Sequence, residues 1–256
     1  MTIYPKVLAD SIENEIKGIG YVYGASDKKI LAAMTRDINK NLGTDIHYLT
    51  EIDMFNLQGS GSIMLNYIHQ FESESVKAYL IPQLVTDRVP NCSEIILDLY
   101  KGFKSSNKYI SAPGESAPVH IAMRYDYAFT KLKPKKYRKE LMNYMIEPRD
   151  IFYLPGTARM IASWKKPEMY ERMLKLYESY SITDNELGLE EGVEGYAPPA
   201  EFIRRELKFT AIDCLKYYPT EEVVEMLVKL LDHSDKHFRN AANKSLKYIE
   251  KHKKGG

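Results

Sequence analysis

The chain has 256 residues, 44% hydrophobic and 28% charged, a balance typical of folded globular proteins and not of disordered chains. Lys and Arg number 36 against 35 Asp and Glu, and a formal net charge of +1 gives the whole chain no electrostatic bias toward nucleic acid or anionic membranes. The two cysteines, Cys92 and Cys214, lie too far apart in sequence to indicate a disulfide framework or a cysteine-based metal site.

Targeting signals are not predicted. The N-terminus lacks the basic segment and the uninterrupted apolar stretch of a signal peptide, because Asp10 and Glu13 come before any apolar run. No run in the sequence approaches the roughly 18 apolar residues of a membrane span. We therefore expect a cytoplasmic protein without a membrane partner. Because no Pro/Gly/Ser-rich linker divides the chain, we expect one elongated domain over residues 1–256.

The first quarter of the chain is predicted to be a helical cap over residues 1–60. Residues 4–17 and 27–40 have the pattern of helices, whereas residues 20–29 between them are open to a short extended segment. Further on, the Gly/Ser turn at 58–62 opens a helix, and its free N–H groups suit either a phosphate or a plain interhelical turn. The lysine and flanking strand of a phosphate loop are missing from the sequence, which favours the turn.

The middle of the chain continues as helices. Residues 74–85, ESVKAYLIPQLV, place Pro82 inside an apolar helical stretch, and residues 92–103 are its expected partner helix. Residues 123–141 and 154–174 are predicted to be helical as well.

A polar stretch containing Gly and Pro follows at 181–200 and is predicted to be an inserted acidic loop. Its segment 184–194 carries five acids and no base. The segment 131–139, KLKPKKYRK, carries six cations and no acid, and the two segments therefore create opposite local fields on one chain.

The C-terminal segment predicts two amphipathic helices joined by a short turn. In 220–233 the apolar residues fall on one helical face, and residues 235–254 repeat that arrangement with lysines crowded into the last turn. We expect Ser234 or Asp235 to cap the second helix. His233 precedes this cap and His237 follows it, so their spacing of four is not helical and a turn is favoured over a metal site.

Similar helix patterns recur along the chain. Alanines in matching positions, Ala128 and Ala158, are 30 residues apart, and Ala211 and Ala242 are 31 apart. Ala158 and Ala211 are 53 residues apart, which exceeds the repeat interval by about 22 residues. This excess is close to the length of the loop at 181–200. A single hairpin cannot bury its apolar stripe alone, so these copies predict a stacked array of hairpins.

The C-terminal hairpin resembles a HEAT repeat. The residues that carry the resemblance after the Asp-containing turn are Phe238, Arg239, Ala242 and Leu246. The resemblance implies an all-α fold, an α-α superhelix or HEAT-like solenoid of antiparallel helix pairs, and the period near 30 is similar to that of short HEAT-like units. In that family the turn Asp commonly pairs with the Arg of the second helix between neighbouring repeats, which implies a role for Asp232 or Asp235 with Arg239.

Tyrosine is the unusual feature of the composition, with 20 residues against one Trp and eight Phe. Tyrosine supplies large contact area at little cost in conformational freedom and is enriched at interfaces. The basic run at 131–139 suits phosphate contacts, although a solvated connection centred on Pro134 is the favoured interpretation. The expected binding residues are Tyr125, Tyr127, Lys135, Lys136, Tyr137, Arg138, Tyr153 and Trp164.

These patterns favour a non-enzymatic scaffold or adaptor that binds a protein or peptide along the concave face of a solenoid. No catalytic constellation is found in the sequence, and no cofactor or metal is expected. The alternative is a HEAT-like DNA-binding protein or alkylpurine DNA glycosylase. That family uses Trp, Tyr, Asp and Arg, which would be supplied here by Trp164, Asp150 and Arg149. Nucleic acid is disfavoured as a partner because the chain has a single Trp and a net charge of +1.

Overall fold

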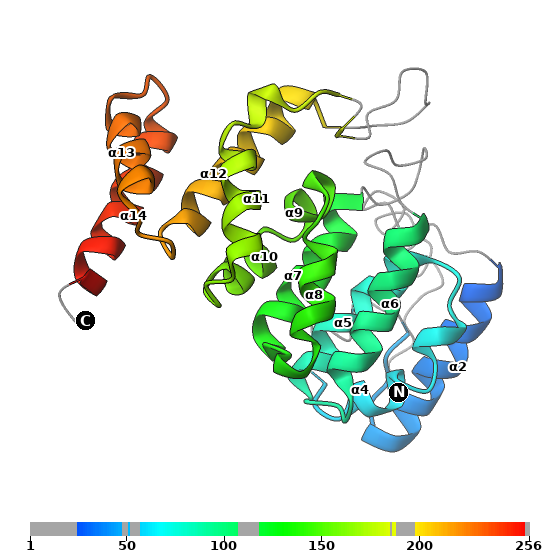
Figure 1. The fold of residues 1–256 in the computed structure, drawn as a ribbon. Helices are drawn as coiled ribbons and strands as arrows, with labels where there is room; N and C mark the ends of the chain where they lie inside the picture. The colour runs from blue at the N-terminus through cyan, green and yellow to red at the C-terminus, as the bar shows by residue number, and fades with distance from the viewer. Residues whose placement is uncertain are drawn as a thin grey trace. The chain divides into compact units, whose positions relative to one another are not determined.

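The computed structural model describes residues 25–47, 51, 57–106, 118–184, 186–187 and 198–253. Every regular element in this part of the chain is helical, which confirms the all-α prediction (Figure 1). The described chain divides into two compact units between Leu132 and Lys133. We call the described residues up to Leu132 unit 1 and those from Lys133 unit 2. The single domain and the solenoid stay predictions.

Unit 1 is built from helices around α5. Its elements are α2 (Ala25–Leu42), α4 (Ser60–Met64), η1 (Ile68–Gln70), α5 (Glu74–Thr86), α6 (Cys92–Ser106) and α7 (Pro118–Leu132). α5 packs against α4, α6 and α7, and α2 packs against α4. The predicted helix at 27–40 is confirmed by α2, and α5 contains Pro82 as expected. The predicted helix at 4–17 and residues 20–24 of the possible extended segment lie outside the described residues.

Four aromatic rings form the centre of unit 1. Tyr100 and Phe103 come from α6, and Tyr125 and Phe129 come from α7; all four are buried. Tyr100 lies 5.3 Å from Tyr125 and 5.7 Å from Phe129 between ring centroids, in edge-to-face arrangements. Aromatic pairs in this geometry stabilise a fold by more than the burial of their apolar area alone.

Carboxylates hold the connections of unit 1. Asp27, buried at the start of α2, accepts hydrogen bonds from the backbone N–H groups of Glu72 and Ser73 at 2.8 and 3.0 Å. Its two oxygens therefore fix the loop that leads into α5. The side chain of Asn39 does the same for Ile46, because its Oδ1 accepts from the Ile46 N–H at 2.7 Å.

The Gly/Ser turn at 58–62 is an interhelical turn, as favoured from the sequence. Oδ2 of Asp87 accepts hydrogen bonds from the N–H groups of Gly59 at 3.0 Å and Gly61 at 2.7 Å, so a carboxylate of the chain itself occupies these amides. Gly59 has φ of 90°, in the left-handed region that favours glycine. A Cβ at Gly61 would lie only 2.9 Å from Oδ2 of Asp87. The carboxylate can approach this closely because glycine has no Cβ.

Unit 2 is arranged around α12, which packs against α9, α10, α11 and α14. The elements are η2 (Lys135–Tyr137), α8 (Arg138–Tyr144), α9 (Pro148–Tyr153), α10 (Pro155–Ala162), α11 (Pro167–Tyr177), η3 (Ser179–Ser181), α12 (Ala200–Leu215), α13 (Glu221–Lys229), η4 (Leu230–Asp232) and α14 (Lys236–Lys253). The helices expected within 123–141 and 154–174 are present, the second as α10 and α11 separated by a short turn.

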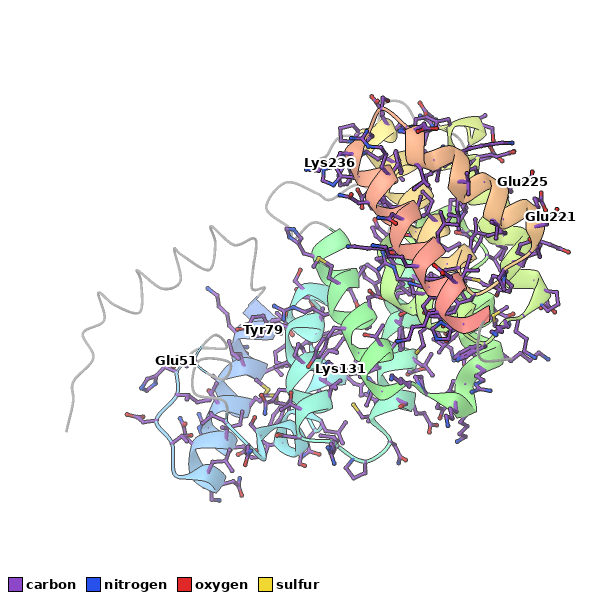
Figure 2. All side chains as sticks on the ribbon, turned by 90° about the vertical axis from the view of Figure 1, so that its left-hand side faces the viewer. Glu51, Tyr79, Lys131, Glu221, Glu225 and Lys236 are labelled. Carbon is purple, nitrogen blue, oxygen red and sulfur yellow. The ribbon has the colours of Figure 1, made fainter. Side chains whose placement is uncertain are left out.

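The C-terminal hairpin is confirmed as two helices joined by a turn. Oγ1 of Thr220 accepts from the N–H of Val223 and caps α13, whose acids Glu221 and Glu225 are exposed (Figure 2). Oδ1 of Asp235 accepts from the N–H of His237 at 2.7 Å, which makes Asp235 the cap of α14. The prediction of a capped turn at this point is therefore correct.

The pairing implied by the HEAT resemblance takes a different form. Arg239 donates to the backbone carbonyls of His233 at 2.6 Å and Ser234 at 2.8 Å, because it lies one turn into α14 and reaches back over its own turn. Asp235 instead pairs with Arg205 of α12, at 3.2 Å. The turn carboxylate thus does join neighbouring helices, but its partner precedes the hairpin.

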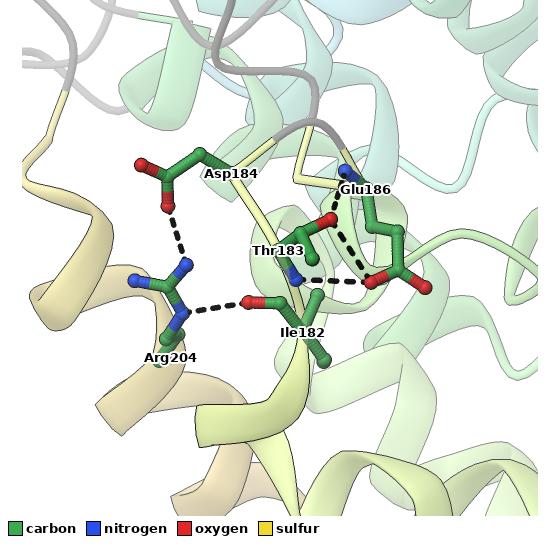
Figure 3. Close-up of polar contacts among 5 residues, drawn as sticks. All are labelled: Ile182, Thr183, Asp184, Glu186 and Arg204. Atoms are coloured by element: carbon green, nitrogen blue, oxygen red, sulfur yellow. Dashed lines mark hydrogen bonds and ion pairs between the residues drawn. The ribbon is translucent and has the colours of Figure 1, made fainter.

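The beginning of the predicted acidic loop is fixed to α12. Arg204 donates through Nε to the Ile182 carbonyl at 2.9 Å and through Nη2 to the Asp184 carboxylate (Figure 3). Thr183 and Glu186 exchange hydrogen bonds between side chain and backbone in the manner of a capping box. These bonds, first that from the Thr183 backbone N–H, hold the pKa of Glu186 below its usual range. Most of the segment from 185 to 197 lies outside the described residues.

None of the helices that the structure describes is long and apolar enough to cross a membrane.

Candidate basic and aromatic binding surface

The structure separates the predicted binding residues into buried and exposed ones. Tyr125 is fully buried in the ring cluster of unit 1, and its hydroxyl lacks a hydrogen-bond partner among the described residues. Burial raises the pKa of Tyr125 well above its ordinary value. Tyr153 in unit 2 is buried too, with its pKa raised by the same cause. Both side chains pack inside their units and present no surface to a partner.

Tyr127 is the predicted residue on the surface of unit 1. It lies on α7 with 38% of its surface exposed, and the ammonium of Lys131, one turn later, lies 5.7 Å from its ring centroid. Both residues lie on α7, so this contact does not join α7 to a second element.

The other five predicted residues all lie in unit 2 and come together there. Lys135, Lys136 and Tyr137 form η2, and Arg138 begins α8 directly after them. The guanidinium of Arg138 lies 4.9 Å from the centroid of the Trp164 ring, and the ammonium of Lys136 lies 5.2 Å from that of Tyr137. The three cations are exposed and both rings are half-buried. The basic run and the single Trp are thus parts of one surface.

Two cations of this surface were missed in the sequence. Lys165 and Lys166 follow Trp164 in the turn between α10 and α11, and both are exposed. The signal was present in the tetrapeptide Trp-Lys-Lys-Pro at 164–167, which combines an aromatic ring with two cations. We define the basic–aromatic surface by its members: Lys135, Lys136, Tyr137, Arg138, Trp164, Lys165 and Lys166.

Backbone contacts hold these elements in place. The N–H groups of Trp164 and Lys165 donate to the carbonyls of Ile161 and Ala162, both at 2.9 Å, and close the turn after α10. Lys165 takes φ of 56°, which folds the chain back sharply. Arg172 of α11 donates to the Met142 carbonyl at the end of α8, at 2.9 Å. α8 and the turn after α10 are therefore both tied to the same framework.

The surface carries five cations, Lys135, Lys136, Arg138, Lys165 and Lys166. Among the described residues, none of its five cations forms an ion pair. Several acids of unit 2 form ion pairs with other cations instead: Asp184–Arg204, Glu186–Lys175, Asp213–Arg159 and Asp235–Arg205. Within the described part of the chain, the surface therefore presents five cations without an ion-pair partner beside two aromatic rings.

His233 and the two thiols of the described chain are engaged or buried. The described part of the chain brings no three metal-ligating side chains together, and Nδ1 of His233 is engaged by the N–H of Asp235. Both thiols are buried, and burial raises the pKa of Cys92 to about 11 and that of Cys214 to about 12. Thiols with such pKa values are protonated at neutral pH and are poor nucleophiles.

The residues considered for the glycosylase alternative lie on two elements: Arg149 and Asp150 are neighbours on α9, and Trp164 follows α10. Trp164 packs under Arg138, whereas Arg149 pairs with Glu147 at 3.2 Å. Asp150 is buried within α9. No protein-family model, curated protein or solved structure matches the chain.

Proposed function

We propose that this chain is a non-enzymatic binding protein, a cytoplasmic HEAT-like solenoid whose basic–aromatic surface binds an acidic segment of a partner protein. The observation that supports the proposal most directly is the contact between Arg138 and Trp164, which joins two separate basic segments into one surface.

The chemistry of the surface suits carboxylates. Exposed ammonium groups attract an acidic chain over a distance of about a Debye length, and this attraction mainly raises the rate of association. The half-buried rings of Tyr137 and Trp164 then offer contact area for the apolar parts of the bound segment. Because the acids at 184 and 186 are already bound to Arg204 and Lys175, the acidic loop is the weaker candidate for selecting a partner by charge.

The test uses the fluorescence of Trp164, the single Trp of the chain, which lies in the proposed site. Titration with a peptide of about 12 residues rich in Glu and Asp is expected to change the Trp emission in a saturable, salt-sensitive way. The double variant Lys165→Glu/Lys166→Glu is expected to weaken binding about tenfold or more, because it turns attraction into repulsion. The matched control, Lys229→Glu/Lys236→Glu, makes the same change of charge at exposed positions away from the surface and is expected to keep the affinity.

An unchanged Trp emission, or an equal loss in both double variants, would contradict the proposal. A single-stranded oligothymidylate of similar length serves as the competing ligand. Preferential, salt-sensitive binding of that strand would favour the nucleic-acid alternative.

A further inference from the structure

The turn after α12 contacts the basic–aromatic surface. The hydroxyl of Tyr218 donates to the carbonyl of Lys166 at 3.0 Å, and its ring lies 5.3 Å from that of Tyr170 at the start of α11. Partial burial raises the pKa of Tyr218 to about 12, so this hydroxyl remains a donor at neutral pH. The turn after α10 and the turn after α12 are therefore joined side by side.

The contacts continue from α12 to α14. The Lys216 ammonium lies 5.3 Å from the ring centroid of Tyr217 and 5.5 Å from that of Tyr248. The rings of Tyr217 and Tyr248 meet edge to face at 5.3 Å, and the imidazole of His252 stacks on Tyr248 at 4.0 Å. The side chains of Lys216, Tyr217 and Tyr248 are half-buried, and that of His252 is exposed.

One arrangement accounts for all these contacts. α10 packs on α12, and α12 packs on α14, so the C-terminal ends of three helices follow one another (Figure 1). Two of these ends have similar sequences, Trp-Lys-Lys-Pro at 164–167 and Lys-Tyr-Tyr-Pro at 216–219. Lysines near helix C-termini interact favourably with the helix dipole, which accounts for some of the cations. It does not account for the ring contacts between Tyr170 and Tyr218 and among Tyr217, Tyr248 and His252.

We propose that these helix ends form one binding track, which runs from Arg138 and Trp164 through Lys216 to Tyr248 and His252 and takes an extended acidic segment of a partner protein. The inference rests on the proposed function and adds the extent of the site and the conformation of its ligand. Neighbouring helices pack about 10 Å apart, so the track from α10 to α14 is about 20 Å long. An extended chain covers that length with about six residues.

The ring contacts favour an acidic protein segment over a nucleic acid. Single-stranded nucleic acids bind by stacking bases on free aromatic faces. In the track, Arg138 lies over Trp164 and His252 stacks on Tyr248, so these faces are already engaged by the chain. Lysine ammonium groups that lie over rings at separate points of the track suit separated carboxylates on an extended peptide.

The experiment compares two fluorescein-labelled peptides of alternating Glu and Ser, one of about four residues and one of about 12 residues. Fluorescence anisotropy of each is measured with the full chain. The short peptide fits one end of the track, and the long peptide reaches both. We expect the long peptide to bind about tenfold more tightly, because its second contact is intramolecular.

Variants locate this gain. Lys216→Ala/Tyr248→Ala is expected to abolish the advantage of the long peptide and to leave the short one unaffected, because the short peptide binds at Trp164. Tyr180→Ala, at a tyrosine that is 56% exposed and off the track, is the control and is expected to keep the advantage. Circular dichroism of each variant verifies that its helices are intact.

The outcomes separate the two proposals. If neither peptide binds, the proposed function fails. If both bind equally, or if the double variant retains the advantage of the long peptide, the track is overturned while the proposed function stands. If oligothymidylate of about the longer length displaces the long peptide at a lower concentration than unlabelled peptide does, the acidic-protein assignment is overturned.

Discussion

Several connections between helices are held by acceptor side chains in unit 1 and by guanidinium donors in unit 2. In unit 1 the side chains of Asp27, Asn39 and Asp87 accept hydrogen bonds from backbone N–H groups of another segment. In unit 2 the guanidinium groups of Arg172, Arg204 and Arg239 donate to backbone carbonyls. Both solutions satisfy polar backbone groups in connections between helices.

The difference matters for the surface potential. An aspartate bound to neutral amides keeps its negative charge, and an arginine bound to neutral carbonyls keeps its positive charge. In each unit, some of the charged side chains that hold the backbone therefore also contribute to the surface potential. The net charge of +1 hides this difference, because it sums over both units. In unit 2 the positive charge that Arg172 and Arg239 retain adds to that of the lysines of the basic–aromatic surface, whereas Arg204 is paired with Asp184.

The largest effect is expected at the buried carboxylate of unit 1. Asp27→Ala leaves the N–H groups of Glu72 and Ser73 without their acceptor, and we expect a loss of about 3 kcal/mol in the free energy of unfolding. Urea unfolding followed by far-UV circular dichroism measures the loss. Asp45→Ala, at an exposed aspartate of the same unit, is the control and should change stability little. Equal effects of both variants would remove the special role given to Asp27.

A smaller effect is expected at the guanidinium of unit 2. Arg204→Ala frees the Ile182 carbonyl and the Asp184 carboxylate, but Asp184 is largely exposed and regains water, so we expect a loss of about 1–2 kcal/mol. Trp164 fluorescence during urea unfolding reports on this unit. Arg204→Lys should recover only part of the loss, because an ammonium lacks the planar fork that serves both acceptors. Full recovery would show that charge alone matters here.

The smallest effect is expected at Asp235 and depends on pH. The hydrogen bond from the His237 N–H, followed by the charge of Arg205, holds the pKa of Asp235 below its usual range. A lowered folded pKa means that this stabilisation is complete above the ordinary aspartate pKa of about 3.9 and disappears as the pH falls through the folded value. Asp235→Ala should therefore lower Tm at pH 7, with the gap to the natural chain closing in acid. Asp235→Asn keeps a cap acceptor without the charge; a gap as large as that of Asp235→Ala would argue against the cap.

The comparison also shows what the sequence could predict. The helices at the C-terminus followed from apolar spacing, and Asp235 as a cap followed from its place before the stripe. The same spacing rule applied to α7 groups Tyr125 with Ile121, Ala122 and Phe129 on one face, so its burial was predictable. Tyrosine-rich composition alone could not separate core rings from surface rings.

Contacts between distant segments were beyond the sequence. Arg138 and Trp164 are separated by 26 positions, and their contact depends on how α8 packs against α10. Nothing in the local pattern marks Asp87 as the acceptor for a turn that lies 26 to 28 positions before it. Residues that act locally were predictable, whereas residues that join two elements were found only in the fold.

The burial of the two thiols makes the chain convenient for site-specific chemistry. Maleimide reagents attack thiolates, and at neutral pH the thiols of Cys92 and Cys214 remain protonated and shielded from solvent. A single cysteine placed at an exposed position, such as Lys139 or Lys251, would therefore be labelled alone. Fluorophores or cross-linkers can thus be attached beside either end of the track while both native cysteines stay in place.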